Sequence, residues 1–343
     1  MSHRFFVSAS ALAILIALVS LAQAPVAGQA PSSAAKQATA AAKTWTPPRT
    51  ADGRPDLQGL WNFATITPLE RPADLAGKQV LADEDVAKLE AAAAEGRIDR
   101  APRTGDTGTY NQFWFDRGTK VVGTRQASLI VDPPDGKLPA YTPEGEKKQA
   151  ALTEARKRNA GPEDRNLGER CILGFNAGPP MLASAYNNNV QLFQSPGYVA
   201  LLNEMVHAAR IVPTGGGPHG TLRLWSGDSR GRWEGDTLVI DTTNFRDEGT
   251  GVLNQRLQGM DKNLHLVERF KRVDADTLLY EFTVDDPTVW TKPWTVRLPM
   301  TKAPDLMFEY ACHEGNYAMT GILAGTRADE KAAAEAAKKK GSN

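Results

Sequence analysis

The chain has 343 residues, of which 41% are hydrophobic, enough for one large domain or two small ones. Its 40 basic residues balance 40 acidic ones, so no net field attracts nucleic acid or an anionic membrane. The sequence also lacks a basic stripe with interleaved aromatic residues, so nucleic acid is not an expected partner.

The N-terminus has the pattern of a secretory signal peptide. MSHRFF carries the positive charge, VSASALAILIALVSLA is apolar, and the small residues predict cleavage after Ala22. An uncleaved anchor is the alternative, but the apolar segment is short for a membrane span. No later segment is apolar enough to cross a bilayer. We therefore expect a signal peptide over residues 1–22, no membrane insertion after its removal, and a protein of the periplasm or the medium.

The next segments are a linker and a mixed region. Residues 23–44 are rich in Ala, Gln, Ser and Pro, which is typical of a linker. Residues 45–170 are expected to wrap or plug the rest of the fold with one or two helices. One helix is predicted over 82–95, where acidic residues occupy the first turn, and an exposed one within 142–166. A strand is predicted over 126–131, before Pro133-Pro134.

Residues 171–325 have β character. VQLFQ and YVALLNE flank Ser195-Pro196-Gly197, a hairpin signal. RWEGDTLV and RVDADTLL repeat this plan 40 residues apart (272 − 232), and APDLMFEY resembles a third hairpin. We expect a mainly β fold, a curled antiparallel meander of about eight to ten strands that closes into a barrel or sandwich. Residues 326–343 are predicted to be a solvated tail or a frayed helix.

The only two cysteines, Cys171 and Cys312, are expected to form a disulfide in an oxidising compartment. The bond would close a loop of 141 residues (312 − 171), worth about 5 kcal/mol in the chain-entropy model. The alternatives are two buried free thiols, or Cys312 as a nucleophile beside His313. Neighbouring residues of a strand point to opposite faces, which argues against such a couple.

Three predicted strand segments combine acidic residues with histidine, a pairing that suits acid–base catalysis. Glu204 shares an apolar strand face with Leu202 and Val206, where burial would raise the pKa of its carboxyl. Glu268 is placed in the same way between Leu266 and Phe270. The candidate catalytic residues are Glu204, His207, His265, Glu268 and His313. The alternatives are charge-paired strands, such as Glu204 with Arg210, and an ordered polar strand end at His313.

Other polar residues are candidate ligand contacts. Tyr186 and Asn188 precede the first hairpin in a Tyr-Asn-Asn-Asn run, which could line a polar mouth or only form turns. Asp241 and Glu281 occupy equivalent positions of the 40-residue repeat, and Tyr310 lies beside the second cysteine region. We group these five residues as a predicted ligand-binding set.

No cofactor or metal is predicted. Four histidines follow the signal peptide, His207, His219, His265 and His313, and three convergent imidazoles could hold zinc or iron. However, HxH, HExxH and CxxC spacings do not occur in the sequence. TGGGPHG lacks the Lys-Ser/Thr of a P-loop, and a Gly-x-Ser-x-Gly elbow is also missing.

Two resemblances follow from short motifs. PDLQGLWN, GDSRGRWEGDTLVIDTTNF and YEFTVDDPTVWTKPW resemble a widespread set of exported bacterial proteins of unassigned function, which implies no activity or catalytic residue. Gly59-Leu60-Trp61 resembles the Gly-x-Trp opening of calycins such as lipocalins. That resemblance implies a barrel for a small apolar ligand, with Trp61 at its closed end under a basic residue, here Arg297 or Arg327.

The leading functional hypothesis is an exported β protein that binds a small, partly apolar molecule in a barrel or between sheets. The alternative is a cofactor-independent periplasmic lyase, isomerase or hydrolase that uses Glu204 or Glu268 with a histidine. A structural envelope protein is a third class, but it does not explain the polar groups on apolar strand faces. The sequence contains no signal for an oligomeric state.

Overall fold

The computed structural model describes residues 45–99, 111–155, 157–158, 160–246 and 262–341. Residues 1–44 and 45–343 form two separate units, and everything below concerns the second. The expected signal peptide, residues 1–22, and the expected linker, residues 23–44, lie outside the described residues. Among the described residues, no helix combines the length and the apolar character needed to cross a membrane.

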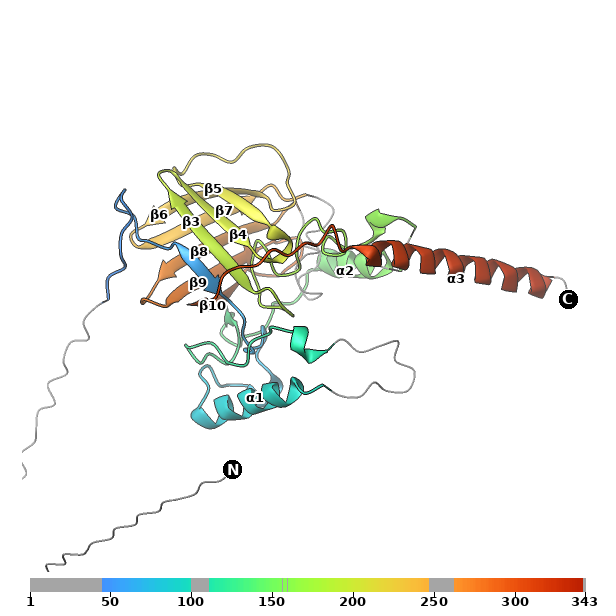
Figure 1. Cartoon of the computed structure of the whole chain (residues 1–343), viewed down its shortest axis with the longest axis horizontal. Helices are drawn as coiled ribbons and strands as arrows, with labels where there is room; N and C mark the ends of the chain where they lie inside the picture. Colours follow the sequence, from blue (N-terminus) through green and yellow to red (C-terminus); the bar gives the residue numbers. More distant parts are fainter. Residues whose placement is uncertain (1–44, 100–110, 156, 159, 247–261, 342–343) are drawn as a thin grey trace, which may run out of the picture. The chain divides into compact units, whose positions relative to one another are not determined.

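A single antiparallel sheet dominates the fold and forms a nearly closed barrel (Figure 1). Its strands follow the order β5-β4-β3-β1-β10-β9-β8-β7-β6, and β2 pairs with β10 beside this path. The predicted mainly β meander is therefore confirmed. The strands are β1 (Gly59–Asn62), β2 (Ile130–Asp132), β3 (Asn189–Ser195), β4 (Tyr198–Asn203), β5 (Ala209–Pro213), β6 (Asp228–Glu234), β7 (Thr237–Thr243), β8 (His265–Arg272), β9 (Thr277–Asp285) and β10 (Trp294–Lys302).

The two end strands of the sheet, β5 and β6, approach each other without a regular ladder. A Cβ atom added to Gly231 of β6 would lie 3.1 Å from Val212 Cγ1 of β5, which explains the need for glycine there. Just beyond β5, the amide of Gly216 donates to the carbonyl of Gly231 at 3.2 Å. These contacts nearly close the sheet and shield its two edges.

Of the four predicted hairpins, three are confirmed and one is wrong. The β3–β4 and β6–β7 turns lie where expected, with Gly197 and Gly235 at positive φ, and β8–β9 confirms the repeat. The hairpin predicted at APDLMFEY is wrong, because β10 ends at Lys302 and residues 303–316 contain no strand. The physical reason is that β10 already pairs with β1, β2 and β9, so it offers this segment no further edge.

The N-terminal region contributes strands as well as helices. β1 lies between β3 and β10, so residues 45–170 complete the sheet as well as wrap it. The strand predicted over 126–131 is shorter and shifted, since only β2 joins β10. The helices are α1 (Asp83–Gly96), α2 (Pro143–Ala155) and α3 (Tyr317–Gly341), and the short 3-10 turns are η1 (Ala73–Leu75), η2 (Gln112–Trp114), η3 (Pro162–Asp164) and η4 (Met205–His207).

Alternate strand residues fill the barrel interior. The inward side chains of β7 to β10 are fully or almost fully buried: Leu238, Ile240, Leu266, Phe270, Leu278, Tyr280, Phe282, Val284, Trp294, Val296, Leu298 and Met300. The rings of Phe270 and Tyr280 lie 4.8 Å apart, and those of Phe282 and Trp294 lie 6.0 Å apart. The interior is a packed core at this level. The cavities lined by described residues lie elsewhere, at the ends and on the outer side of the sheet.

The predicted disulfide is confirmed. Cys171 and Cys312 are bonded, with their Cα atoms 5.7 Å apart, so Cys312 is no free nucleophile. Beside the bond, the side chain of Asn316 donates to the carbonyl of Glu169 at 2.8 Å. The irregular segment after β10 is thereby attached to the loop that precedes β3.

Trp61 has the buried position expected from the calycin resemblance, but with a different basic partner. Its indole donates to the carbonyl of Leu57, and the guanidinium carbon of Arg272 lies 5.6 Å from its ring centroid. Arg297 instead pairs with Glu281, and Arg327 donates to the carbonyl of Ala160. The choice of Arg297 or Arg327 is therefore wrong. The last strand, β10, does end beside Trp61, at Lys302, but the guanidinium over the ring is that of Arg272 at the end of β8.

Candidate functional sites

β8 divides two of the candidate residues between opposite faces of the sheet. Glu268 points into the barrel and is completely buried, whereas His265 lies on the outer face. Glu268 accepts hydrogen bonds from both terminal nitrogens of Arg210, one at 2.9 Å, and from the hydroxyl of Tyr280 at 2.8 Å. Glu268 therefore cannot reach His265 or a substrate. Its expected acid–base role is contradicted, and the charge-paired strand is the correct alternative.

Burial and charge have opposing effects in this internal ion pair. Burial alone would lower the pKa of Arg210, but the neighbouring Glu268 carboxylate raises it and keeps the guanidinium charged. Burial, with the same carboxylate, raises the pKa of Tyr280 well above its usual value, so its phenol stays a hydrogen-bond donor. The group is a structural network in a filled core.

A cavity of about 380 Å³ opens where β3 begins and β4 ends. We call it the tyrosine cavity. The side chains that line it come from the end of η2 and the segment after it, from the start of β3 and the run before it, from the residue after β4 and from the irregular segment after β10: Trp114, Asp116, Tyr186, Asn187, Asn189, Glu204 and Tyr310. Three of the candidate residues are thus brought together: Tyr186 and Tyr310 from the predicted ligand-binding set, and Glu204 from the predicted catalytic set.

Aromatic rings form one wall of the tyrosine cavity. Tyr186 and Tyr310 stack with their centroids 6.2 Å apart and their planes inclined by 26°. Phe175 supports Tyr186 from the edge, at 5.5 Å. Burial, together with the hydrogen bond to Tyr310, raises the pKa of Tyr186 to about 12. The phenol of Tyr186 is therefore neutral at any physiological pH.

Two carboxylates form the polar part of the tyrosine cavity. Glu204 is 6% exposed and accepts hydrogen bonds from the side chain of Asn189 at 2.7 Å and the amide of Phe308 at 3.3 Å. Asp116 as a whole is exposed, but its carboxyl loses part of its water to the neighbouring side chains, and this desolvation raises its pKa. The charge of Arg97 opposes this rise, while that of Glu204 adds to it. Among the described residues, no donor contacts the carboxylate of Asp116.

Asn188 lies behind the cavity and not in it. Its side chain is fully buried and donates to the carbonyls of Asp116 at 2.6 Å and Ser184 at 3.1 Å. Its side-chain oxygen accepts from the amide of Ser184 at 2.8 Å. The prediction that Asn188 contacts a ligand is contradicted. The residue instead fixes the backbone of Asp116, and the turn-forming alternative is correct.

His207 and His313 are both exposed and lie outside strands, contrary to prediction. His207 belongs to η4, where it and Val206 have positive φ, because the chain reverses tightly between β4 and β5. His313 lies in a turn beside the disulfide. Neither histidine lines the tyrosine cavity beside Glu204. The five predicted catalytic residues therefore do not form one site.

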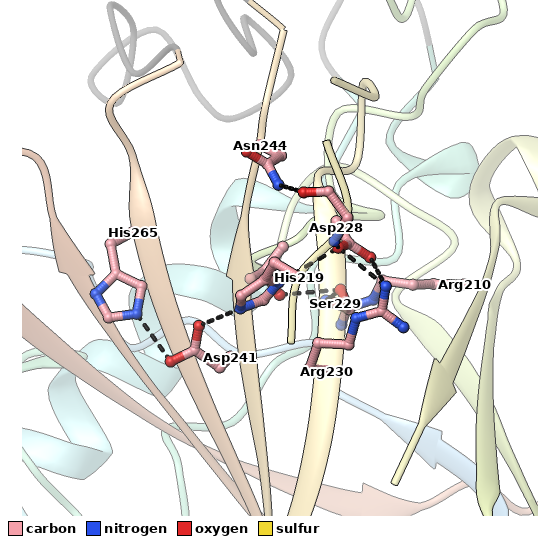
Figure 2. A network of polar contacts seen from close by, with 10 residues as sticks. Arg210, His219, Asp228, Ser229, Arg230, Asp241, Asn244 and His265 are labelled. Atoms are coloured by element: carbon pink, nitrogen blue, oxygen red, sulfur yellow. Dashed lines mark hydrogen bonds and ion pairs between the residues drawn. The ribbon is translucent and has the colours of Figure 1, made fainter. Parts of the chain in front are cut away.

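The outer face of β7 and β8 carries a second polar group, which we call the His–Asp–His cluster. Asp241 of β7 accepts from two imidazoles through different oxygens (Figure 2). His219 Nε2 lies 2.9 Å from Oδ1, and His265 Nε2 lies 2.9 Å from Oδ2. His265 was a predicted catalytic residue and Asp241 a predicted ligand contact. The third member, His219, comes from the loop between β5 and β6.

Further contacts fix the loop that carries His219. Asp228 of β6 accepts from the amide of Gly220 at 2.6 Å, lies 3.4 Å from His219 Nδ1, and pairs with Arg230 at 3.2 Å. Asn244 donates to the carbonyl of Gly220 at 2.8 Å (Figure 2). The loop is therefore attached to both β6 and the end of β7. His219 is thus positioned by the framework around it.

The cluster keeps Asp241 ionised. Partial burial raises the pKa of Asp241, but the hydrogen bonds from His265 and His219 outweigh it and lower the pKa below the usual 3.8. The side chain of His265 is 43% exposed, so its ring can exchange protons with solvent or a substrate. This arrangement joins one carboxylate to two imidazoles, with aspartate in place of the expected glutamate.

Glu281 does not join Asp241, although the repeat places them at equivalent positions. Glu281 of β9 accepts from Arg297 Nε at 3.0 Å and lines a cavity of about 500 Å³ with Arg71 and Gln126. β8 lies between β7 and β9, so the two carboxylates belong to different sites. The grouping of Glu281 with Asp241 is wrong, because Glu281 pairs with Arg297 whereas Asp241 is hydrogen-bonded to His219 and His265.

Within the described part of the chain, no group of three or more His, Cys, Asp or Glu side chains is arranged to hold a metal ion. In the His–Asp–His cluster, each Nε2 faces a separate carboxylate oxygen. The other two histidines, His207 and His313, are exposed elsewhere. The geometry is that of a hydrogen-bonded chain.

Neither a protein-family model nor a curated protein matches this chain, so function must be argued from its side chains. Sequence reasoning missed two of them, Asp116 and His219. Both lie outside strands, where alternation of polar and apolar residues gives no signal. Asp241 was named because it matches Glu281 in the 40-residue repeat, and His265 because it lies close to Glu268 in the sequence.

Proposed function

We propose that this protein binds a small, partly apolar molecule in the tyrosine cavity. The observation that carries the proposal is the combination of the stacked Tyr186–Tyr310 pair with the Asp116 carboxylate, which no donor from the described residues contacts. Aromatic walls with a few polar groups, in a cavity of about 380 Å³, suit a small ligand. The proposed site is therefore at the open end of the β3–β4 hairpin. The barrel interior, where the ligand was first expected, is filled by side chains.

Two aromatic variants and one control test the location. Tyr186→Ala and Tyr310→Ala are expected to weaken ligand binding by about tenfold or more, because they remove the apolar wall. Tyr317→Ala is the control, since that ring is 83% exposed and lies outside the cavity. Native mass spectrometry of protein from its own host identifies the ligand, and titration measures its affinity for each variant. Equal affinities for Tyr186→Ala and Tyr317→Ala would reject the cavity as the site.

We further propose that the protein works after export, in the periplasm or the medium. The N-terminal sequence pattern and the Cys171–Cys312 bond support this location. Mass spectrometry of the protein recovered from cell fractions is expected to show a chain that begins at Gln23. Full-length chain in the cytosol, with both cysteines reduced, would contradict the proposal.

A second candidate function is proton transfer at the His–Asp–His cluster, as in a cofactor-independent lyase, isomerase or hydrolase. The observation that favours it is the hydrogen bond from His265 Nε2 to Asp241. If the neutral ring donates its Nε2 proton there, the lone pair of Nδ1 is left as a base. A proton taken up at Nδ1 makes an imidazolium that the Asp241 carboxylate stabilises.

An ester with a good leaving group tests this second candidate. We expect His265→Gln to lower the hydrolysis of p-nitrophenyl acetate, and Asp241→Asn to lower it and shift its pH profile. His313→Gln is the control, because His313 is also exposed but has no such partner in the described part of the chain. The candidate is rejected if His265→Gln and His313→Gln both keep the native rate.

A further inference from the structure

We infer that the ligand of the tyrosine cavity is an organic cation, an ammonium group carried on a partly apolar body. The inference rests on the proposed function and names the ligand class of that same site. It follows from the charge of the lining, from the chemistry of the aromatic walls and from the hydrogen bonds that are already made.

The described lining of the tyrosine cavity is negative. It contains Asp116 and Glu204 and no Lys, Arg or His. Elsewhere in the described chain, two strand carboxylates have a cationic partner: Glu268 pairs with Arg210, and Glu281 pairs with Arg297. Asp116, which is exposed, forms no ion pair with a described residue, and only the more distant charge of Arg97 acts on it. A bound cation would supply the missing charge, whereas an anion would be repelled.

The aromatic walls suit the same ligand. The faces of Tyr and Trp rings attract cations through their quadrupole, and an ammonium group within about 6 Å of a ring centroid gains from it. Tyr186 and Tyr310 stack with their rings 6.2 Å apart, and Trp114 also lines the cavity. Acid groups beside aromatic faces are the chemistry that recognises quaternary ammonium ligands.

A neutral polyol fits the lining less well, because few amide groups remain for it. The side chain of Asn189 donates to Glu204 at 2.7 Å and accepts from Asn62 at 2.8 Å, so both of its functions are used. Glu204 itself already accepts two hydrogen bonds. Asn187 alone provides an amide that no described residue engages. A sugar needs several such donors and acceptors at once, while an ammonium group needs mainly charge and aromatic surface.

Three probes of similar solubility separate these ligand classes. Choline is the cation, 3,3-dimethylbutan-1-ol is its neutral carbon isostere, and glucose is the polyol. We expect calorimetric titration of the full mature protein at low salt to show that choline binds at least about tenfold more tightly than its isostere. This ratio corresponds to a difference of about 1.4 kcal/mol in binding free energy. Added salt is expected to weaken the binding of choline and to leave the binding of the isostere unchanged.

One substitution tests the role of charge. Asp116→Asn keeps the shape of the side chain. It is expected to lower the affinity for choline about tenfold without changing the affinity for the isostere. Asp329→Asn is the matched control, because Asp329 is exposed on α3 and lies outside the cavity. Circular dichroism of each variant verifies that the fold is intact.

The outcomes separate this inference from the proposed function. Equal binding of choline and its isostere, or binding of glucose alone, would overturn the cation while the cavity remains a binding site. If Asp116→Asn and Asp329→Asn bind choline equally, the assigned carboxylate is wrong and the inference fails. If none of the three probes binds at millimolar concentration, the inference fails. The proposed function is then judged by the native mass spectrometry and the tyrosine variants alone.

Discussion

Glutamate and tyrosine meet at two places in this molecule, with opposite consequences. Inside the barrel, Glu268 is completely buried, and Arg210 and Tyr280 satisfy its carboxylate. In the tyrosine cavity, the charges of Glu204 and Asp116 face an open space beside Tyr186. The same residue types therefore form a closed structural network in one region and an open candidate binding site in the other.

The difference comes from position along the strands. Glu268 lies in the middle of β8, where neighbouring strands cover it and β5 supplies the guanidinium of Arg210. Glu204 follows the last residue of β4, where the sheet ends and loops take over. A polar group in the middle of a packed sheet needs hydrogen-bond partners from the protein itself. A polar group at the rim of the sheet can keep part of its hydrogen-bonding capacity for a ligand.

The largest effect is expected from removal of the disulfide that holds one wall of the open region. Cys171→Ser with Cys312→Ser should lower the free energy of unfolding by about 5 kcal/mol, because the bond closes a loop of 141 residues. It should also abolish binding in the tyrosine cavity, since Tyr310 lies in a segment without strand partners. Denaturant unfolding and ligand titration measure the two effects. Native affinity in the double serine variant would show that this tether is dispensable.

The second largest effect on stability is expected from the buried network of Glu268, Arg210 and Tyr280. Glu268→Gln leaves the charge of Arg210 buried without a counter-ion, so we expect a loss of about 3–5 kcal/mol in the free energy of unfolding, measured with urea. Arg210→Met with Glu268→Met should recover most of this loss. Glu281→Gln is the control, because its pair with Arg297 is partly exposed and should cost less than about 1 kcal/mol. Equal losses for the two glutamate variants would contradict the contrast between the regions.

The burial of Tyr186 in the tyrosine cavity should be visible in an alkaline titration. The pKa of Tyr186 is raised to about 12, so the folded state prefers the protonated phenol. Its contribution to stability is present below the unfolded pKa of about 10 and is lost as pH rises toward about 12. Ultraviolet absorbance of native protein against Tyr186→Phe isolates this ionisation. A phenol of Tyr186 that titrates near pH 10 would mean that the cavity wall is solvated.

The smallest effect is expected at the His–Asp–His cluster. The lowered pKa of Asp241 means that its contribution is present above pH 3.8 and is lost as pH falls through the lower folded value. Because the three side chains are partly exposed, Asp241→Asn should change the free energy of unfolding by less than about 1 kcal/mol near neutrality. The difference from the native protein should vanish in acid. A difference that persists at low pH, measured by denaturant unfolding, would indicate a role other than charge.

Much of the local structure could be predicted because its causes are local. Gly197 and Gly235 set the turns of two hairpins, and the 40-residue repeat marked Asp241 as a strand residue. An even cysteine count, together with a predicted signal peptide, was enough to predict the disulfide. The candidate site was predicted only in part, since Tyr186 and Tyr310 were named together as ligand contacts, while Glu204 was assigned to a separate catalytic set.

The amino-acid pattern alone was sufficient for the class of fold, for three of the four predicted hairpins and for the cysteine pairing, because turn residues, periodicity and cysteine number act over short distances or by count alone. The tertiary structure decided which polar groups meet. Asn188 fixes Asp116, 72 residues away, and Arg210 neutralises Glu268, 58 residues away. Such contacts depend on strand order, with β1 inserted between β3 and β10, and that order is fixed only when distant segments pack together.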